Sequence, residues 1–353
     1  MDKIGLILEA YDLKDKELEI RKYGSGHIHG TYLLHAGAER FILQAYNKKV
    51  FRFPERISGN QNILSEHLGA EKLPFALPLP IKNLDGNFFS VHGHQLFRLF
   101  PFVEGLTKDA VELPQEAHLA AEAFGIFIKA FLDVSTEGFQ ETIPDFHNLT
   151  LRYQQLQDSI HNTKLTIDRE LQALMEFYIG QTGLLYQYQD YQKKLPLRVT
   201  HNDTKINNLI FEENLSKVNA LIDLDTIMPG FIFYDFGDLV RTVACSEDES
   251  SQNWNSIQVD LDKYKSLITG FCNPLKPTVS KEELASLPYG GEMMTYIMGL
   301  RFLTDYLNGN VYYHINYPQQ NLHRAKNQFH LLSSLQENRA RIGEMMEEVT
   351  KDQ

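Results

Sequence analysis

Residues 199–211 read VTHNDTKINNLIF, a polar centre between two short apolar runs. The apolar runs have the composition of short buried strands, whereas the centre holds one aspartate, one lysine and three asparagines. A surface loop can carry such residues, because Asn and Asp suit turns. Here the polar centre is fixed at both ends by core strands, so its side chains are presented rigidly and are candidates for a functional site.

A second acidic segment, ALIDLDTIMPG, follows at residues 220–230. Asp223 and Asp225 on this segment, together with Asp203 and Asn208 on the first, place oxygen atoms on neighbouring strand-like stretches. Carboxylate and amide oxygens suit a hard ion such as Mg²⁺ rather than zinc or copper. An acid beside such ligands could orient a hydroxyl group and accept its proton. Metal ligands combined with such an acid are what phosphoryl transfer to an alcohol requires.

The periodicity of the rest of the chain predicts a β-rich part followed by a mainly helical part. After a short opening helix, strands are expected at 17–23, 30–36 and 40–46, a helix at 53–70, and strands at 87–93 and 94–105 after a turn at Asp85-Gly86. Helical patterns follow at 114–132, 166–193, 259–271, 281–308 and 318–349, and residues 197–241 read as strand-rich and irregular. We therefore predict an α+β chain with a small β-rich lobe over residues 1–104 and a larger, mainly helical lobe over residues 105–353.

Composition limits the class of protein. The chain has 353 residues and a net charge of −12, which argues against a nucleic-acid partner because such proteins carry a basic face. Two cysteines, Cys245 and Cys272, cannot form a disulfide framework and suit a reducing compartment. No signal peptide and no membrane-spanning apolar run is seen. A cytoplasmic protein that contacts neither membrane nor nucleic acid is expected.

The motif order resembles a known superfamily. HNDTKINN is similar to the catalytic loop of protein-kinase-like enzymes, in which an aspartate is followed five residues later by a metal-binding asparagine. IDLD at 222–225 takes the position of the metal-binding acidic strand. With YGSGHIHGTY at 23–32, YDFGD at 234–238 and RFLTDYLNGNVYY at 301–313, the chain resembles the aminoglycoside phosphotransferase-like small-molecule kinases, and among them the N-acetylhexosamine 1-kinases.

This resemblance implies a two-lobed protein-kinase-like fold that binds ATP and Mg²⁺. The small-molecule acceptor would be an amino sugar, N-acetylglucosamine or N-acetylgalactosamine, phosphorylated at its anomeric hydroxyl. Asp203 would orient that hydroxyl and Lys205 would meet the γ-phosphate. Asn208 and Asp223 would hold the metal, while Asp225 is either a second metal contact or a solvated neighbour. Asp235 in YDFGD would brace the catalytic loop through backbone hydrogen bonds.

The nucleotide is expected on the β-rich lobe. Backbone amides of the turn at Gly24, Ser25 and Gly26 could approach the phosphates closely, although such turns are also common in hairpins. In the segment LFRLFPFVEG, Phe100 and Phe102 would supply apolar surface beside the adenine.

One position departs from the kinase pattern. Kinases carry a lysine on the third strand that grips the α- and β-phosphates, and Gln44 stands there in this chain. The sequence does not decide whether Glu55 or Glu66 is the helix acid that faces that strand.

The resemblance also implies that the acceptor is contacted by residues from three parts of the chain, namely His27, His29, Thr204, Arg301, Asp305 and Tyr312. Each of these residues could instead have a purely structural role. A loop histidine could be satisfied locally, Arg301 and Asp305 could form a buried ion pair, and Tyr312 could simply pack.

Two other functions are compatible with the sequence. The same fold could phosphorylate choline, homoserine, methylthioribose or an aminoglycoside. A non-catalytic nucleotide-binding pseudokinase is the second, to which Gln44 gives slight support, whereas the intact Asp203, Asn208 and Asp223 speak against it.

Overall fold

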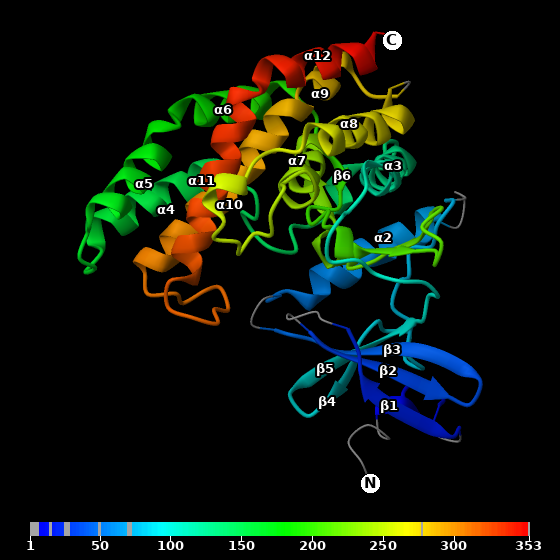
Figure 1. Cartoon of the computed structure of the whole chain (residues 1–353). Helices are drawn as coiled ribbons and strands as arrows, with labels where there is room; N and C mark the ends of the chain where they lie inside the picture. The colour runs from blue at the N-terminus through cyan, green and yellow to red at the C-terminus, as the bar shows by residue number, and fades with distance from the viewer. Residues whose placement is uncertain are drawn as a thin grey trace. The chain divides into compact units, whose positions relative to one another are not determined.

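The computed structural model describes residues 7–13, 16–24, 29–48, 51–68, 73–276 and 278–351. A small antiparallel sheet comes first along the chain, and helices make up most of the remainder (Figure 1). The predicted α+β class, with a small antiparallel sheet and a larger helical part, is confirmed.

The sheet has five strands in the order β1-β2-β3-β5-β4, and each neighbouring pair is antiparallel. The strands are β1 (Leu18–Lys22), β2 (Gly30–Ala36), β3 (Glu39–Ala45), β4 (Ser90–His92) and β5 (Gln95–Pro101). Each predicted strand of this region is therefore found. The predicted turn at Asp85-Gly86 is also present, because Gly86 has a φ of 79° and the Asn83 carboxamide accepts the amide hydrogens of Asp85 and Asn87.

The register of β3 and β5 places an apolar pair and a polar pair of side chains on opposite faces of the sheet. Leu43 pairs with Leu99, and both are buried in a cluster that includes Ile7 and Leu8. The next pair along the register is Gln44 with Arg98. Because successive side chains of a strand point to opposite faces, Gln44 and Arg98 lie side by side on the face away from that cluster.

The chain divides by contacts into two compact units that are not contiguous in sequence. The first comprises Met1–Leu106, Glu137–Ile143 and Ile210–Ile227, and the second comprises Thr107–Thr136, Pro144–Leu209 and Met228–Gln353. The first unit thus contains the five-stranded sheet, helix α2 (Pro54–Leu68), strand β8 (Val218–Leu221) and the acidic segment. The predicted division into domains at residue 104 stays a prediction.

The second unit is built mainly of helices. They are α3 (Pro114–Ala130), α4 (Leu149–Asn162), α5 (Arg169–Gly180), α6 (Thr182–Lys194), α7 (Ile232–Val243), α8 (Leu261–Leu275), α9 (Lys281–Ala285), α10 (Leu287–Leu307), α11 (Gln320–Glu337) and α12 (Arg339–Thr350). Helices α7 and α10 cross closely through Gly237 and Gly290, since a Cβ atom at Gly237 would collide with the carbonyl group of Gly290. This close crossing positions α7, which carries Asp235.

Several predicted helix boundaries were wrong. The helix expected at 166–193 is two helices separated at Gln181, and the patterns at 281–308 and 318–349 are broken at Ser286 and Asn338. Helix α10 begins afresh because Pro288 lies in its first turn, where a missing N–H is tolerated.

The region 197–241 holds the expected short strands and one unexpected helix. The strands are β6 (Arg198–Thr200), β7 (Leu209–Phe211), β8 and β9 (Met228–Gly230). Residues 232–243 form α7, in which all but Thr242 are buried. The segment IFYDFGDLVRTV does carry a helical hydrophobic period, which the interpretation of residues 197–241 as strand-rich overlooked.

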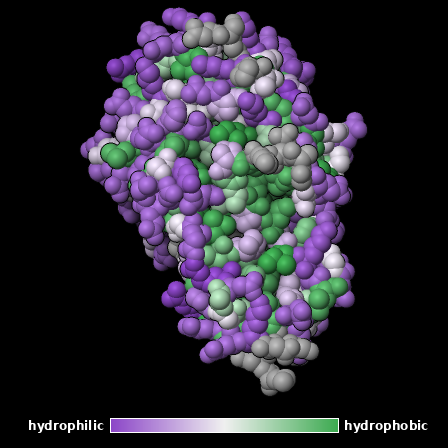
Figure 2. All heavy atoms as spheres, turned by 90° about the vertical axis from the view of Figure 1, so that its right-hand side faces the viewer, coloured by the Kyte–Doolittle hydropathy of each residue, from purple (hydrophilic) through white to green (hydrophobic). Residues whose placement is uncertain are grey.

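None of the described helices is both long enough and apolar enough to cross a membrane. Hydrophilic residues predominate toward the edges of the face drawn in Figure 2, in keeping with the 23% of charged residues in the chain.

Candidate active site

The backbone of the segment THNDTKINN is fixed from behind by Asp235. Its carboxylate accepts the amide hydrogens of His201 at 2.9 Å and of Asn202 at 2.7 Å, and its backbone carbonyl accepts the Thr204 hydroxyl at 2.6 Å. Asn202 has a φ of 64°, a left-handed conformation that Asn tolerates better than most residues. The predicted bracing role of Asp235 is confirmed.

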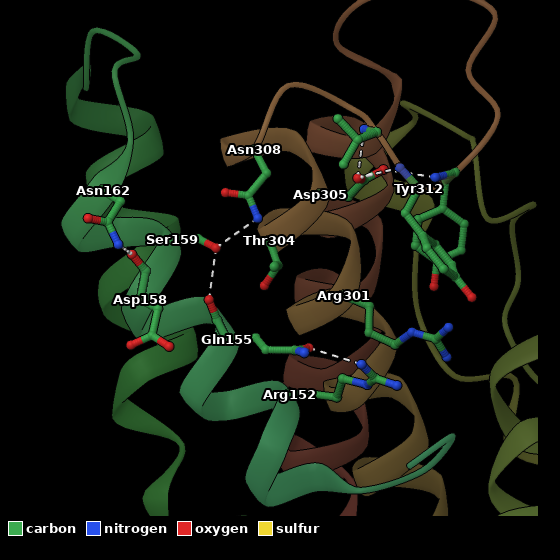
Figure 3. Close-up of a pocket in the computed structure, with 12 residues that line it drawn as sticks. Arg152, Gln155, Asp158, Ser159, Asn162, Arg301, Thr304, Asp305, Asn308 and Tyr312 are labelled. Carbon is green, nitrogen blue, oxygen red and sulfur yellow. Dashed lines mark hydrogen bonds between the residues drawn. The ribbon is translucent and has the colours of Figure 1, made fainter. Parts of the chain in front are cut away.

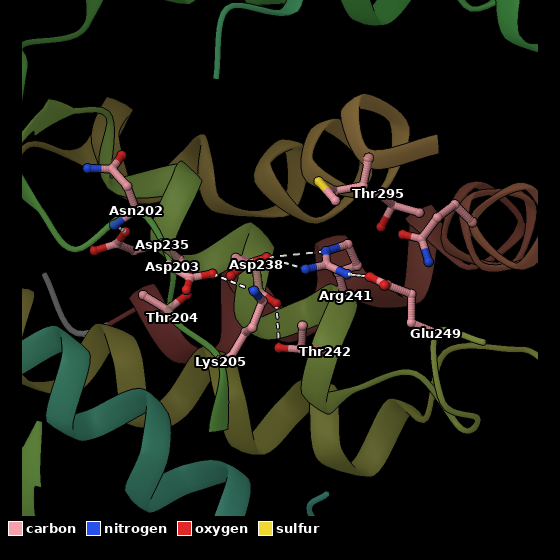
Figure 4. Close-up of polar contacts among 12 residues, drawn as sticks. Asn202, Asp203, Thr204, Lys205, Asp235, Asp238, Arg241, Thr242, Glu249 and Thr295 are labelled. Carbon is pink, nitrogen blue, oxygen red and sulfur yellow. Dashed lines mark hydrogen bonds and ion pairs between the residues drawn. The ribbon is translucent and has the colours of Figure 1, made fainter. Parts of the chain in front are cut away.

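Asp203 on this braced loop faces the side chain of Lys205 (Figure 4) and also contacts Asn208. The Lys205 Nζ lies 2.8 Å from Asp203 Oδ1. The Asn208 carboxamide nitrogen donates to the Asp203 backbone carbonyl at 2.8 Å and to Oδ2 at 3.2 Å. The sequence interpretation brought these three residues together, and the structure does the same.

Their charges stabilise one another. Burial alone would raise the pKa of Asp203, but the charge and hydrogen bond of Lys205, together with His201 and Asn208, outweigh burial and lower that pKa. The negative charge of Asp203 in turn raises the pKa of the Lys205 ammonium. At neutral pH the pair is therefore ionised, and Asp203 is a hydrogen-bond acceptor rather than a strong base.

A second buried ion pair lies on α7 near the loop. Arg241 donates to Asp238 Oδ1 from Nε at 3.2 Å and from Nη2 at 2.8 Å, and it also pairs with Glu249. This arrangement gives Asp238 a structural role, since both partners on the helix are almost fully buried.

His147 also supports the loop, and sequence reasoning missed it. Its Nε2 donates to the backbone carbonyl of Asn202 at 3.0 Å, and its ring packs against Tyr234. Burial lowers the pKa of His147 to about 4, so the imidazole is neutral at neutral pH.

The acidic segment in the first unit places its two aspartates differently. Asp223 is exposed and has a φ of 60°, again a left-handed conformation that is uncommon outside glycine. Asp225 is buried, and its Oδ1 and Oδ2 accept Nη1 and Nη2 of Arg98 at 2.6 and 2.8 Å. His29 Nε2 lies 3.2 Å from Oδ2, and the Gln61 carboxamide donates to Oδ1 at 3.4 Å.

Asp225 is therefore neither solvated nor directed toward a free ligand. Its oxygens already take four hydrogen bonds, which is the usual capacity of a carboxylate. Burial alone would raise the pKa of Asp225, but the charge and hydrogen bonds of Arg98 and His29 together outweigh burial and lower that pKa. The metal role of Asp225 stays a prediction, and it would require one of these partners to yield.

Arg98 carries a buried positive charge on the sheet face that also holds Gln44. Its side chain is 1% exposed, and it donates from Nη2 to Gln44 Oε1 at 2.9 Å as well as to Asp225. The guanidinium also lies over the rings of Tyr46 and Phe100, at 5.0 and 5.1 Å from their centroids. The strand sequence QLFRLFP contained a signal, since a charged residue between apolar neighbours in a buried strand requires a partner.

Glu55 and Glu66, between which the sequence did not decide, do not supply the carboxylate that pairs with Arg98. Each is exposed on α2, whereas Gln61 on the same helix is buried and reaches Asp225. The helix thus contributes a neutral carboxamide, and the charge pair is Arg98 with Asp225.

The remaining predicted nucleotide residues are only partly described. Ser25, Gly26 and His27 lie outside the described residues, and Gly24 has a φ of 75°. Phe102 donates its amide hydrogen to the carbonyl of Arg40, whose guanidinium lies 4.4 Å from the Phe102 ring centroid. The roles of Gly24, Gln44, Phe100 and Phe102 in nucleotide binding stay predictions.

His29 is enclosed by side chains of the first unit. Its Nδ1 accepts the amide hydrogen of Asn47 at 3.0 Å, so that Nε2 donates to Asp225, and its ring stacks on Tyr46 and Phe51. With its side chain 6% exposed, His29 has the geometry of the locally satisfied histidine that the sequence left open. A substrate contact from His29 stays a prediction.

The predicted acceptor residues near the C-terminus gather at a pocket on α4 and α10 (Figure 3). Asp305 is buried, and its carboxylate accepts the amide hydrogens of Val311, Tyr312 and Tyr313 at 2.8–3.0 Å. It also accepts a hydrogen bond from Asn321. Asp305 therefore holds the loop that follows α10.

Arg301 and Tyr312 also line the pocket. Unlike the Asp305 carboxylate, the side chains of these two residues make no hydrogen bond to the backbone in the part of the chain that the structure describes. The Arg301 guanidinium carbon lies 5.3 Å from the ring centroid of Phe146, 5.8 Å from Tyr312 and 5.6 Å from Tyr313. Among the described residues the structure gives Arg301 no carboxylate partner, so the expected alternative of a buried pair with Asp305 is not found.

The metal ligands can be judged by their chemistry. Because both hydrogens of the Asn208 carboxamide point to Asp203, its oxygen is the end available to a cation, and the exposed Asp223 offers a carboxylate. No group of three His, Cys, Asp or Glu side chains that could hold a metal ion occurs in the described ranges. Each residue taken by itself thus offers an oxygen of the kind that Mg²⁺ prefers, and the metal role of Asn208 and Asp223 stays a prediction.

Comparison with known proteins decides the family. Residues 19–263 match the phosphotransferase enzyme family, abbreviated APH, and this span includes the loop around Asp203, the acidic segment and YDFGD. The chain belongs to this family.

Solved structures show the APH fold over nearly the whole chain. An aminoglycoside phosphotransferase from Alicyclobacillus acidocaldarius has a TM-score of 0.63 at 14% identity and covers 96% of each chain. A microcompartment-associated aminopropanol kinase has a TM-score of 0.59 at 14% identity, covering 96% of this chain and 98% of its own. A choline kinase from Cryptosporidium parvum has a TM-score of 0.55 at 16% identity and covers 96% of each chain. At these identities the similarity concerns the fold.

Proposed function

We propose that this APH-family protein is an ATP-dependent small-molecule kinase that phosphorylates the anomeric hydroxyl of N-acetylglucosamine or N-acetylgalactosamine. The observation that carries the proposal is the position of Asp203, held between Lys205 and Asn208 on a loop braced by Asp235. An aspartate on such a loop is the group that phosphoryl transfer to an alcohol requires.

The mechanism is direct in-line transfer. The acceptor hydroxyl donates its hydrogen bond to Asp203, and its oxygen forms a bond to the γ-phosphorus while the bond from that phosphorus to the ADP oxygen breaks. The hydroxyl proton passes to Asp203 and then to solvent. A lowered pKa suits this role, because phosphoryl transfer depends mainly on the orientation of the nucleophile and on charge stabilisation.

Lys205 and the bound metal ion would offset the negative charge of the phosphates. The Lys205 ammonium, 41% exposed, can turn from Asp203 toward the γ-phosphate. Asn208 and Asp223 would hold Mg²⁺, which supplies positive charge to the phosphate oxygens when bound. Thr204 has its hydroxyl bound to the Asp235 carbonyl, so any contact with the acceptor would come from its backbone or methyl group.

The pocket residues support an acceptor site near Asp203 within the second unit. The Arg301 guanidinium lies over the ring of Phe146, which packs at 4.3 Å on the ring of His147, and His147 binds the backbone of Asn202. A short path of side chains thus runs from Arg301 to the residue that precedes Asp203. Tyr312, which is 63% exposed, offers a ring face on which a sugar can stack.

Parallel assays of ATP consumption test the proposal. We expect turnover with N-acetylglucosamine or N-acetylgalactosamine, weaker use of glucose, and none with the 1-O-methyl glycosides, whose anomeric oxygen is blocked. The methyl glycosides should instead inhibit competitively, because the acetamido group and ring hydroxyls remain. Turnover of a methyl glycoside at the rate of the free sugar would exclude the anomeric hydroxyl as the acceptor group.

The second candidate is a kinase for a cationic alcohol. Solved structures with this fold include an ethanolamine kinase from Plasmodium vivax and the Cryptosporidium parvum choline kinase, at 13% and 16% identity. Turnover of choline or ethanolamine alone in the same assay would favour this candidate, and failure of every acceptor with retained ATP binding would favour a pseudokinase. A cytoplasmic location stays a prediction.

A further inference from the structure

The pocket on the second unit has an unusual charge pattern. It encloses about 460 Å³ and is lined by residues of α4 and α10 and of the loop after α10, among them Arg152, Asp158, Arg301, Asp305, Asn308 and Tyr312. Figure 3 shows the side chains of Arg152 and Arg301 close together at one end of the pocket, with Asp158 and Asn162 on α4 at the other.

Neither arginine has a carboxylate partner in the part of the chain that the structure describes. Arg152 donates from Nη1 to the Gln155 carboxamide at 2.9 Å and from Nη2 to the backbone carbonyl of Asp145 at 2.8 Å, and its Nε is buried without a partner. Arg301 contacts the Met298 sulfur at 3.8 Å and otherwise only aromatic rings. The partners of both guanidinium groups are thus neutral.

The acids that line the pocket do not balance these charges. Asp305 is 4% exposed, and its carboxylate is occupied by the backbone amides of residues 311–313 and by Asn321. Asp158 is exposed and accepts a hydrogen bond from Gln154 at 2.9 Å. A further acid whose charge acts on Arg152 is Asp145, and its carboxylate accepts a hydrogen bond from the Asn148 carboxamide. At the end of the pocket that holds Arg152 and Arg301, the two cations therefore outnumber this carboxylate.

Two neighbouring guanidinium groups that are half-buried repel one another, and each loses part of its hydration. Burial and then the charge of Arg301 lower the pKa of Arg152, as expected for such a pair. An oxyanion between them would relieve the repulsion and accept hydrogen bonds from both planar groups, for which carboxylate and phosphate are well shaped.

We propose that Arg152 and Arg301 form an anion subsite of the acceptor pocket, which takes a carboxylate or phosphate group carried by the sugar. This inference rests on the proposed function, because it assumes that the pocket binds the acceptor. Its consequence is that the preferred substrate is an acidic amino sugar or sugar acid, and that cationic alcohols are excluded by the same charges.

The first test uses the unaltered protein with four acceptors. They are N-acetylglucosamine 6-phosphate and glucuronic acid, which carry the two candidate anions, neutral N-acetylglucosamine, and cationic glucosamine. We expect kcat/KM for at least one acidic acceptor to exceed that for N-acetylglucosamine about 10-fold or more, as charge-assisted hydrogen bonds allow, and glucosamine to be the poorest. The acidic acceptor that is preferred identifies the anion as phosphate or carboxylate.

The second test compares Arg152→Met with Arg152→Lys and with Arg341→Met, a control on an exposed arginine of α12. The acidic-to-neutral ratio of kcat/KM should fall about 10-fold in Arg152→Met, less in Arg152→Lys, and remain as in the wild type in the control. Calorimetric titration of N-acetylglucosamine 6-phosphate and glucuronic acid in the absence of ATP measures the subsite without catalysis.

The outcomes separate this inference from the proposed function. Phosphorylation of N-acetylglucosamine with no gain for either acidic sugar in turnover or binding would overturn the anion subsite and leave the proposed function standing. Tight binding of an acidic sugar that depends on Arg152, without phosphorylation of any sugar, would support the subsite and overturn the kinase assignment. Equal binding of glucosamine and the acidic sugars would also overturn the subsite.

Discussion

Arg98 on β5 and Asp225 on the acidic segment form a two-pronged ion pair, with nitrogen–oxygen distances of 2.6 and 2.8 Å. Both side chains are almost fully buried, at 1% and 3% exposure. The pair links the sheet face that holds Arg98 and Gln44 to the segment that also carries Asp223. Two neutral side chains complete the arrangement, since Gln44 accepts a hydrogen bond from Arg98 and Gln61 donates one to Asp225.

Removal of one partner of this pair should destabilise the first unit strongly. In Arg98→Met the Asp225 carboxylate would remain buried without its cation, at a cost of about 3–5 kcal/mol in the free energy of unfolding. Urea unfolding of this variant, and of Arg21→Met as a control on an exposed arginine of the same sheet, measures the loss. Equal unfolding midpoints for the two variants would contradict a structural role for the pair.

Substitution of the two aspartates of the acidic segment should have different effects. Asp223→Ala should abolish Mg²⁺-dependent nucleotide binding while the protein still unfolds cooperatively, because Asp223 is exposed and its loss opens no cavity. Asp225→Ala should weaken nucleotide binding less but lower the unfolding temperature, since it leaves Arg98 buried without a carboxylate. Nucleotide affinity at limiting Mg²⁺ and thermal melting distinguish them, and an Asp223→Ala protein with wild-type affinity would be evidence against metal ligation.

His147 should make the second unit sensitive to mild acid. The unfolded chain binds a proton at this residue below about pH 6.5, whereas in the folded protein burial lowers the pKa to about 4. The contribution of His147 is therefore fully present above pH 6.5 and is lost as the pH falls toward 4. Between pH 7 and pH 5 the loss should be about 2 kcal/mol.

The variant His147→Gln retains a hydrogen-bond donor without a titrating group. Its free energy of unfolding should consequently change less than that of the wild type between pH 7 and pH 5. Parallel pH dependences for the two proteins would show that His147 does not titrate as the structure requires.

The sequence predicted the catalytic segment well because its chemistry is local. Asp203, Lys205 and Asn208 lie within six residues, and short strands at both ends fix their backbone, so the spacing alone brings their side chains together. The strands of the sheet were also predictable, because each has a clear boundary of Gly or turn residues.

The environment of Asp225 was not predictable in the same way. Arg98 lies 127 residues before it, and only the pairing of β3 with β5 places Arg98 beside Gln44 and within reach of the acidic segment. The environment of Asp305 was also not predictable, although its backbone partners lie only six to eight residues further along the chain. The resemblance implied that Asp305 contacts the substrate, and this stays a prediction. The sequence did not show that the chain turns back after Gly309 and presents consecutive amide hydrogens to the Asp305 carboxylate.

The central claim is that Asp203 orients an anomeric hydroxyl for transfer of the γ-phosphoryl group of ATP. The most direct measurement is the rate of ADP formation with N-acetylglucosamine and N-acetylgalactosamine, for the wild type and for Asp203→Asn, with ATP affinity measured in parallel. We predict sugar-dependent turnover in the wild type and a reduction of at least about 10²-fold in the variant, with ATP binding nearly intact. An Asp203→Asn protein that retains more than half of the wild-type turnover would contradict the account.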